Sequence, residues 1–195
     1  MLNREKTIHS FNHNNIIEYF GIKIQELPYV DKINLRLDPN NNDYMSICSK
    51  ILGAVLPTKP NTYVQNEKVK IIWLGPNEWL IVIEYQSEKN DIFSKLQSSN
   101  NDKEASVTDV SENRTIIRLS GKKIITLLSK FLVLDLEKNL GTPSSCAQTI
   151  FVKVPILLVR NDDNNQIPVI DIFTNRSHAN YIYNLLVDGT KNLDF

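Results

Sequence analysis

Few side chains in this sequence have the chemistry of a nucleophile, a base or a metal ligand. The main candidates are two cysteines and three histidines: Cys48, Cys146, His9, His13 and His178. A reactive thiol needs a base or an electropositive surrounding, and no such group stands at a fixed spacing from Ser145-Cys146. We therefore interpret both cysteines as small buried residues rather than as catalytic groups.

The spacing of these residues also argues against a metal site. His9 and His13 have helical spacing, which is a weak metal signal, and no acidic partner follows them at ligand spacing. Cys48 and Cys146 are far apart and have no second cysteine or histidine nearby, so neither a disulfide framework nor a zinc site is expected. The two N-terminal histidines are assigned a solvated or interface role, and no catalytic or metal-binding residue is predicted.

The glycines exclude the common nucleotide-binding fingerprint. The chain has six, at positions 21, 53, 75, 121, 141 and 189, and no two form a Gly-x-Gly arrangement. That arrangement lets backbone approach a pyrophosphate at a helix N-terminus, so no cofactor-binding residue is predicted in this chain. The segment Ser120-Gly121-Lys122-Lys123 lacks the glycines of a phosphate-binding loop, and we interpret Ser120 as a helix N-cap.

Charge and hydropathy restrict the partners of the chain. The 195 residues carry 22 basic and 22 acidic side chains with no basic stripe, so nucleic acid is not an expected partner. The longest apolar runs, residues 79–83 and 154–159, are far shorter than the roughly 20 residues that cross a bilayer. The first 15 residues lack the apolar core of a secretory signal. We expect no membrane association and a cytoplasmic location.

Hydrophobic periodicity predicts alternating groups of strands and helices in the first half of the chain. The predicted elements are strands at residues 21–26 and 32–37, a helix at 43–52, strands at 68–74 and 78–85, and a helix at 91–97. Gly53 can end the first helix. The two later strands are predicted to form a hairpin, because Gly75-Pro76-Asn77 between them has the residues that such a turn requires.

The same order of elements recurs in the second half. The predicted elements are strands at residues 105–110 and 115–119, a helix at 122–132, strands within 148–160 broken at Pro155, a strand at 169–173 and a helix at 177–187. This order predicts an α+β fold with two similar β-β-α-β-β(-β)-α halves, antiparallel sheets and helices. The predicted division is an N-terminal arm at 1–20, a first half at 21–97 and a second half at 104–188, together one compact unit.

Four large or charged side chains are candidates for a subunit interface. Trp73 and Trp79 flank the hairpin turn and suit either an interface anchor or the core of the hairpin. Arg114 and Arg118 fall on one face of a strand because side chains alternate. They suit a surface that another chain covers, or a solvated face with an ion pair to Asp109 or Glu112.

A structural ion pair is also predicted near the C-terminus. Asp171 lies on the strand at residues 169–173, and Arg176 follows it within reach. We expect these two side chains to neutralise each other.

Six short motifs occur in a characteristic order between residues 70 and 186. They are Trp73-Leu-Gly-Pro-Asn-Glu-Trp79, Asp109 with Ser111 and Arg114, Arg118-Leu-Ser-Gly121, Leu134-Asp-Leu136, Ser145-Cys-Ala-Gln-Thr149, and Asp171 with Arg176-Ser177 and Tyr181. In this order the motifs resemble the gamma subunit of heterotetrameric sarcosine oxidase, a small relative of the folate-binding aminomethyltransferase fold. The first 40 residues carry little of the resemblance.

The resemblance implies a non-catalytic subunit of a larger enzyme. That enzyme oxidatively demethylates sarcosine to glycine, forms hydrogen peroxide and, with tetrahydrofolate, releases methylenetetrahydrofolate. The implied partners are alpha, beta and delta subunits, and FAD, FMN, NAD and tetrahydrofolate are implied in the alpha and beta subunits rather than in this chain. No catalytic residue of the family maps onto this sequence.

Two alternatives remain open at this stage. The chain could be the gamma-type subunit of a related oxidoreductase that acts on another N-methyl amino acid, because substrate choice would reside in a partner chain. It could also be a stand-alone folate or one-carbon binding protein, which would need an apolar pocket with a carboxylate for the pterin.

Overall fold

The computed structural model describes residues 7–8, 16–84, 89–100, 105–162, 167–191 and 193. The strands among these residues form two antiparallel sheets, one of six strands and one of five. The chain divides into two compact units, of which unit 1 comprises Met1–Tyr29 with Glu112–Phe195 and unit 2 comprises Val30–Ser111. Unit 2 is therefore inserted into the sequence of unit 1.

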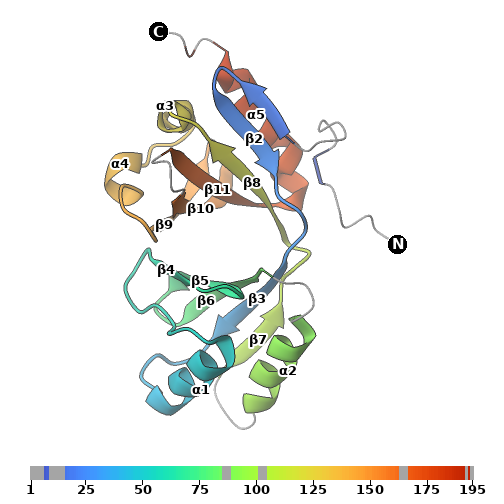
Figure 1. The fold of residues 1–195 in the computed structure, drawn as a ribbon, viewed down its shortest axis with the longest axis vertical. Coiled ribbons are helices and arrows are strands. Elements are labelled where there is room, and N and C mark those ends of the chain that lie inside the picture. Colours follow the sequence, from blue (N-terminus) through green and yellow to red (C-terminus); the bar gives the residue numbers. More distant parts are fainter. Residues whose placement is uncertain are drawn as a thin grey trace. The chain divides into compact units, whose positions relative to one another are not determined.

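Unit 2 is a five-stranded sheet with two helices on one face (Figure 1). Its elements are β3 (Asp31–Arg36), α1 (Asn42–Leu52), β4 (Tyr63–Gln65), β5 (Val69–Gly75), β6 (Glu78–Ile83), α2 (Lys89–Ser99) and β7 (Ser106–Asp109). The strand order is β4-β5-β6-β3-β7. Strands β5 and β6 pair as the predicted hairpin, with a register shift between Trp73 and Gly75. The hairpin prediction is confirmed.

Helix α1 shows how local sequence sets both ends of a helix. The side chain of Asn41 accepts a hydrogen bond from the backbone N–H of Tyr44 at 3.0 Å, which satisfies a donor of the first turn. Gly53 has a left-handed φ of 66° and donates its N–H to the carbonyl of Ser49. The helix therefore begins and ends where its capping residues stand, and its termination at Gly53 is confirmed.

Unit 1 is a six-stranded sheet whose core lies against α3 and α5. Its elements are β1 (Ile16–Tyr19), β2 (Ile22–Glu26), β8 (Arg114–Ser120), α3 (Ile124–Ser129), α4 (Leu136–Asn139), β9 (Cys146–Phe151), β10 (Val154–Asp162), β11 (Pro168–Asn175), a 3-10 turn (Arg176–His178) and α5 (Ala179–Thr190). The strand order is β1-β2-β8-β11-β10-β9. The mixed α+β class with antiparallel sheets is confirmed.

The helix predicted at residues 122–132 begins later and is shorter. Ser120 is the last residue of β8, and α3 begins only at Ile124. The prediction that Ser120 is a helix N-cap is therefore wrong. Gly121 follows Ser120 with a φ of 139°, and a Cβ atom there would lie 2.3 Å from the carbonyl oxygen of Gly21. This close backbone approach requires glycine at position 121, between the end of β8 and the start of α3.

The order of elements repeats as predicted, but the compact units do not coincide with the predicted halves 21–97 and 104–188. The first strand of each repeat joins the sheet of the other repeat, because β2 pairs with β8 and β7 pairs with β3. Residues 16–26 therefore belong to unit 1 and residues 106–109 to unit 2. Strand pairing depends on long-range backbone hydrogen bonds, which the order of elements along the chain does not specify.

The break between β9 and β10 lies at Val152 and Lys153, two to three residues before the predicted break at Pro155. Pro155 is the second residue of β10 and is registered with Ile150 of β9. Pairing of β10 with β11 starts only at Leu157. Pro155 thus stands near a strand boundary, where a missing N–H donor is tolerated.

Candidate functional site

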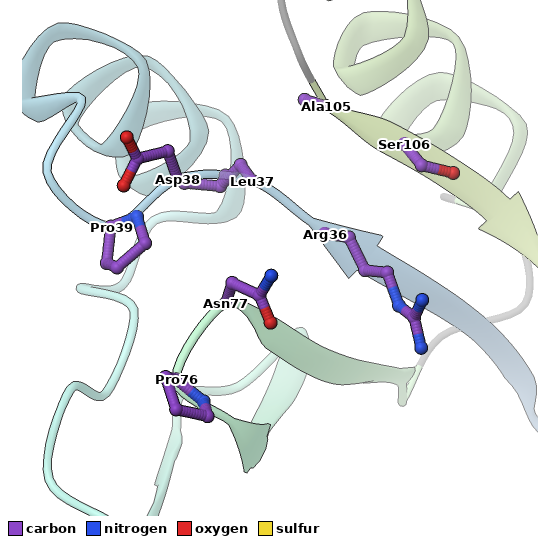
Figure 2. Close-up of a pocket in the computed structure, with 8 residues that line it drawn as sticks. All are labelled: Arg36, Leu37, Asp38, Pro39, Pro76, Asn77, Ala105 and Ser106. Carbon is purple, nitrogen blue, oxygen red and sulfur yellow. The ribbon is translucent and has the colours of Figure 1, made fainter.

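Unit 2 carries an open surface pocket of about 880 Å³ beside the β5–β6 hairpin (Figure 2). Its lining comes from the end of β3 and the following loop, the hairpin turn, and the start of β7: Arg36, Leu37, Asp38, Pro39, Pro76, Asn77, Ala105 and Ser106. The backbone N–H of Leu37 donates to the carbonyl of Asn77 at 3.2 Å and joins the turn to the end of β3. The turn of the Trp73-to-Trp79 motif is therefore part of the pocket.

The polar groups of this pocket have partners nearby. Arg36 donates to Glu78 at 2.9 Å, so the guanidinium charge is partly neutralised. The hydroxyl of Ser106 lies 3.3 Å from that of Thr108. The eight lining residues include no histidine, cysteine or lysine, and their charged side chains are Arg36 and Asp38. An open pocket of this kind suits contact with another chain better than enclosure of a small substrate.

The two tryptophans of the hairpin have different environments. Trp79 is 0% exposed in the core of unit 2, and its Nε1–H donates to the carbonyl of Pro57 at 2.8 Å. Trp73, its cross-strand partner, is half-buried. Trp79 is thus a core residue, which corrects its assignment as an interface candidate. Trp73 keeps that assignment as a prediction.

Arg118 is held by a buried carboxylate. Its Nε and Nη2 donate to the two oxygens of Asp171 at 2.7 and 2.8 Å, a bidentate pair between registered residues of β8 and β11. The Asp171 side chain is 3% exposed and the Arg118 side chain 36% exposed. The guanidinium therefore neutralises a charge inside unit 1, while part of it stays accessible.

This ion pair corrects the expectation that Asp171 pairs with Arg176. Arg176 donates to Glu112 at 3.2 Å, and Asp171 has Arg118 as its partner. Cross-strand register decides the choice, because β8 and β11 place residues 118 and 171 directly opposite each other. Arg114, at the opposite end of β8 from Ser120, is half-buried and remains a candidate for a subunit contact.

The two cysteines are buried free thiols in different units, Cys48 on α1 and Cys146 on β9. Burial raises the pKa of the Cys146 thiol to about 12. The thiolate form, which is the nucleophile, is therefore strongly disfavoured near neutral pH. His178 is half-buried at the start of α5, whereas His9 and His13 lie outside the described residues. In the described part of the chain, no group of three or more acidic, histidine or cysteine side chains could hold a metal ion.

The Asp109 and Ser111 motif has a structural role at the boundary of unit 2. Ser111 donates its backbone N–H and its hydroxyl to Oδ1 of Asp109 at 3.0 and 2.6 Å. Ser111 also accepts the backbone N–H of Lys32 at 3.0 Å. The Lys32 ammonium donates to the carbonyls of Val30 and Ser111 at 2.6 and 3.2 Å. These contacts join the two ends of unit 2.

The buried charges that the sequence analysis missed include Lys32 and Glu26, each 2% exposed. The pattern of alternation contained a signal for Glu26, because it stands on the same strand face as Ile22 and Ile24. A carboxylate on an apolar face predicts specific donors nearby. For Lys32 no such signal exists, since its partners are backbone carbonyls from two separate segments.

Among the described residues, no helix is long and apolar enough to span a membrane. The fold of the chain is similar to that of the aminomethyltransferase T of the glycine cleavage system from Bartonella henselae. The TM-score is 0.58 at 13% identity, over 86% of this chain and 45% of the other. The chain thus has the α+β fold of the aminomethyltransferase class.

Family comparison identifies the chain more narrowly. Residues 36–192 match the model described as "Sarcosine oxidase, gamma subunit family", and the chain belongs to this family. The sarcosine oxidase subunit gamma of Corynebacterium sp. (strain P-1) is 23% identical over 74% of this chain and 70% of its own length. The subunit from an Arthrobacter species is also 23% identical, over 74% and 70%.

A second solved structure is similar to this chain with a higher TM-score. A chain of the heterotetrameric sarcosine oxidase from Corynebacterium sp. U-96, in complex with pyrrole 2-carboxylate, matches with a TM-score of 0.80. The identity is 20%, and the match covers 93% of this chain and 89% of that chain. The resemblance of the six sequence motifs to the gamma subunit is therefore confirmed.

Proposed function

We propose that this chain is the non-catalytic gamma subunit of a heterotetrameric sarcosine oxidase. The observation that carries the proposal is the match to a chain of that enzyme over nearly the whole length of this one, together with the family match. In this proposal the complex oxidatively demethylates sarcosine to glycine and forms hydrogen peroxide. With tetrahydrofolate present, the one-carbon unit leaves as methylenetetrahydrofolate.

Alpha, beta and delta subunits are the proposed partners. FAD, FMN, NAD and tetrahydrofolate are proposed to bind in the alpha and beta subunits, and this chain contributes contact surface. Two properties of the chain support this division. Its six glycines form no Gly-x-Gly arrangement, and burial holds the Cys146 thiol in its unreactive form.

The proposed contact residues are Trp73 and those of the pocket beside the hairpin in unit 2, and Arg114 and Arg118 in unit 1. Trp73 and Arg114 are half-buried, and the Arg118 side chain keeps 36% of its surface exposed. A stable interface buries on the order of 800 Å² on each partner and depends on aromatic and arginine anchors at its centre. These three residues have the required types and partial accessibility.

Co-expression with alpha, beta and delta chains tests the proposal. We expect this chain to co-purify with them in a defined complex, and sarcosine to produce peroxide with the complex but not with this chain alone. The matched control is co-expression of the three partner chains without this one. Independent purification of this chain, together with full activity of the three partners alone, would refute the subunit role.

The same preparation separates the two alternatives. Turnover of another N-methyl amino acid in preference to sarcosine would assign the chain to a related oxidoreductase. The likeness to an aminomethyltransferase keeps a folate-binding protein under consideration. Titration of the isolated chain with tetrahydrofolate tests it, and stoichiometric binding in the absence of partners would favour a stand-alone one-carbon carrier.

A further inference from the structure

A buried carboxylate binds residues 7 and 8 at the end of the unit 1 sheet. Glu26, the last residue of β2, is 2% exposed. Its Oε2 accepts the backbone N–H of Ile8 at 3.0 Å, and the N–H of Thr7 lies 3.1 and 3.3 Å from Oε1 and Oε2. The Thr115 hydroxyl donates to Oε1 at 2.8 Å. Two consecutive backbone donors and one hydroxyl thus surround the carboxylate.

The two residues are also held by an apolar contact and by helix α5. Ile8 is 0% exposed and belongs to the core of unit 1, together with Ile24 of β2 and Ile182 of α5. The Nδ2 amide of Asn180 on α5 donates to the carbonyl of Thr7 at 3.1 Å. The segment therefore has three attachments: a carboxylate on the sheet, an amide on the helix and an apolar socket between them.

The position of Glu26 explains why these attachments depend on one another. Ile22 and Ile24 on its strand face are apolar, and its registered partner on β8 is Ile117, so the carboxylate lies at the edge of an apolar surface. An ionised carboxylate on such a face is costly unless donors surround it. Two of its donors come from a segment outside the sheet. Removal of that segment would leave the carboxylate undersatisfied and the socket of Ile8 open.

We propose that residues 7 and 8 form a docked strap and that Glu26, Thr115 and Asn180 form its receptor site. The site fits an extended chain segment in which two adjacent N–H donors precede an apolar side chain. Thr7 and Ile8 lie outside the strands of the sheet, so their contacts can open without breaking the ladder of the central strands. The strap is therefore a separate opening unit of unit 1, a property that the role of the chain as a subunit neither requires nor predicts.

Amide hydrogen exchange in the full-length chain, followed residue by residue by NMR, tests the proposal. Glu26→Gln removes the charge that the two N–H groups meet, and Asn180→Ala removes the donor to the Thr7 carbonyl. We expect both variants to accelerate amide exchange at Thr7 and Ile8. The acceleration should be on the order of tenfold or more for Glu26→Gln and smaller for Asn180→Ala. Exchange at the central strands β8 and β11 is expected to keep its native rate.

The matched control substitutions lie on β1, which pairs with β2, and on α5 itself. Glu18→Gln changes an exposed carboxylate on neighbouring β1, and Asn184→Ala changes an exposed amide on α5. Neither should alter exchange at Thr7 and Ile8.

Two results would overturn the strap. One is native exchange at Thr7 and Ile8 in both test variants. The other is equal acceleration at these residues and throughout β8 and β11, because Glu26 would then support the whole fold rather than a separate segment. If Glu26→Gln fails to fold, the comparison of Asn180→Ala with Asn184→Ala decides by the same two criteria.

Discussion

The two units have the same arrangement of strands but a different order along the chain. Unit 2 has the order β4-β5-β6-β3-β7, and unit 1 has the corresponding order β9-β10-β11-β8-β2 with β1 added at the edge. Strand β7, beside β3, follows the other elements of unit 2, whereas β2, beside β8, precedes every element of unit 1 except β1. The position beside β3 and the corresponding position beside β8 are thus each filled by a strand of suitable register, although that strand comes late in the sequence of one unit and early in that of the other.

The units also differ in the partners of the charged side chains on the corresponding strands β3 and β8. Lys32 on β3 donates to the backbone carbonyls of two chain segments. Arg118 on β8 forms a bidentate pair with Asp171 on the neighbouring strand. The architecture therefore repeats without repetition of residues, because each unit satisfies its polar groups locally.

Helix stabilisation follows the same division. In unit 2, α1 has an Asn41 cap and a Gly53 end within its own sequence. In unit 1, α3 has six residues and no side-chain cap, and the following Lys130 donates to the carbonyl of Gly189 at 2.8 Å. A Cβ atom at Gly189 would lie 2.6 Å from the Phe131 ring. The short helix therefore depends on close contact with α5 rather than on its own ends.

The largest expected effect concerns the core of unit 2. Trp79→Ala removes a fully buried side chain and its hydrogen bond to Pro57, and we expect a loss of about 3–5 kcal/mol in the free energy of unfolding. Trp73→Ala, at the half-buried partner, should cost well under half of that. Denaturant unfolding followed by circular dichroism measures both. Equal losses would contradict the assignment of Trp79 alone to the core.

A smaller loss is expected from the ion pair of unit 1. Arg118→Ala leaves the buried Asp171 carboxylate without its partner, and we expect a loss of about 2 kcal/mol in unfolding free energy. The matched change in unit 2 is Arg36→Ala. Its pair with Glu78 is more exposed, at 59% and 24%, and should contribute about 0–1 kcal/mol. The double variant Arg118→Ala, Asp171→Ala should lose less than the sum of its single changes, and additive losses would contradict the pairing.

The next prediction asks which unit contacts the partner chains, and it rests on the proposed subunit role. Arg114→Ala in unit 1 and Trp73→Ala in unit 2 are each expected to weaken assembly by about 1–2 kcal/mol if the residue anchors the interface. The affinity for co-expressed partner chains measures the effect, with the exposed Lys122→Ala as control. An effect of only one variant would assign the interface to that unit. Unchanged assembly in both would remove these residues from the proposed surface.

The smallest expected effect concerns the cap of α1. Asn41→Ala removes the acceptor of the Tyr44 N–H and should lower the free energy of unfolding by about 1 kcal/mol. The neighbouring exposed Asn42→Ala should change it by less than about 0.5 kcal/mol. Equal effects of the two substitutions in a denaturant titration would show that the hydrogen bond to Tyr44 does not stabilise the helix.

Elements with a long local signal could be predicted from the sequence, and the shortest ones could not. The α1 helix, the β5–β6 hairpin and the repeated order of elements follow from periodicity, capping residues and turn residues. β1, β4 and α4 have four, three and four residues. A segment of that length completes about one helical turn or two strand periods, which is too little for a periodic pattern to stand out.

The sequence predicted which residues are candidates for contacts, but it did not predict which residues they contact. Trp73 and Trp79 were recognised as a pair, yet only the packing of unit 2 places one of them in the core. Asp171 was expected to pair with a residue five positions later, and its partner is Arg118, 53 positions away in the sequence. Ion-pair choice therefore followed cross-strand register and not proximity along the chain.

The sequence by itself determined the α+β class, the repeated order of strands and helices, the ends of α1 and the family resemblance, because all of these depend on residues close together in the chain. Only the tertiary structure decided that β2 and β7 exchange sheets, that Asp171 meets Arg118, and that Glu26 holds residues 7 and 8. Each of these results joins segments that are distant in sequence. Their physical basis is strand register and the need of buried polar groups for partners, which local periodicity does not encode.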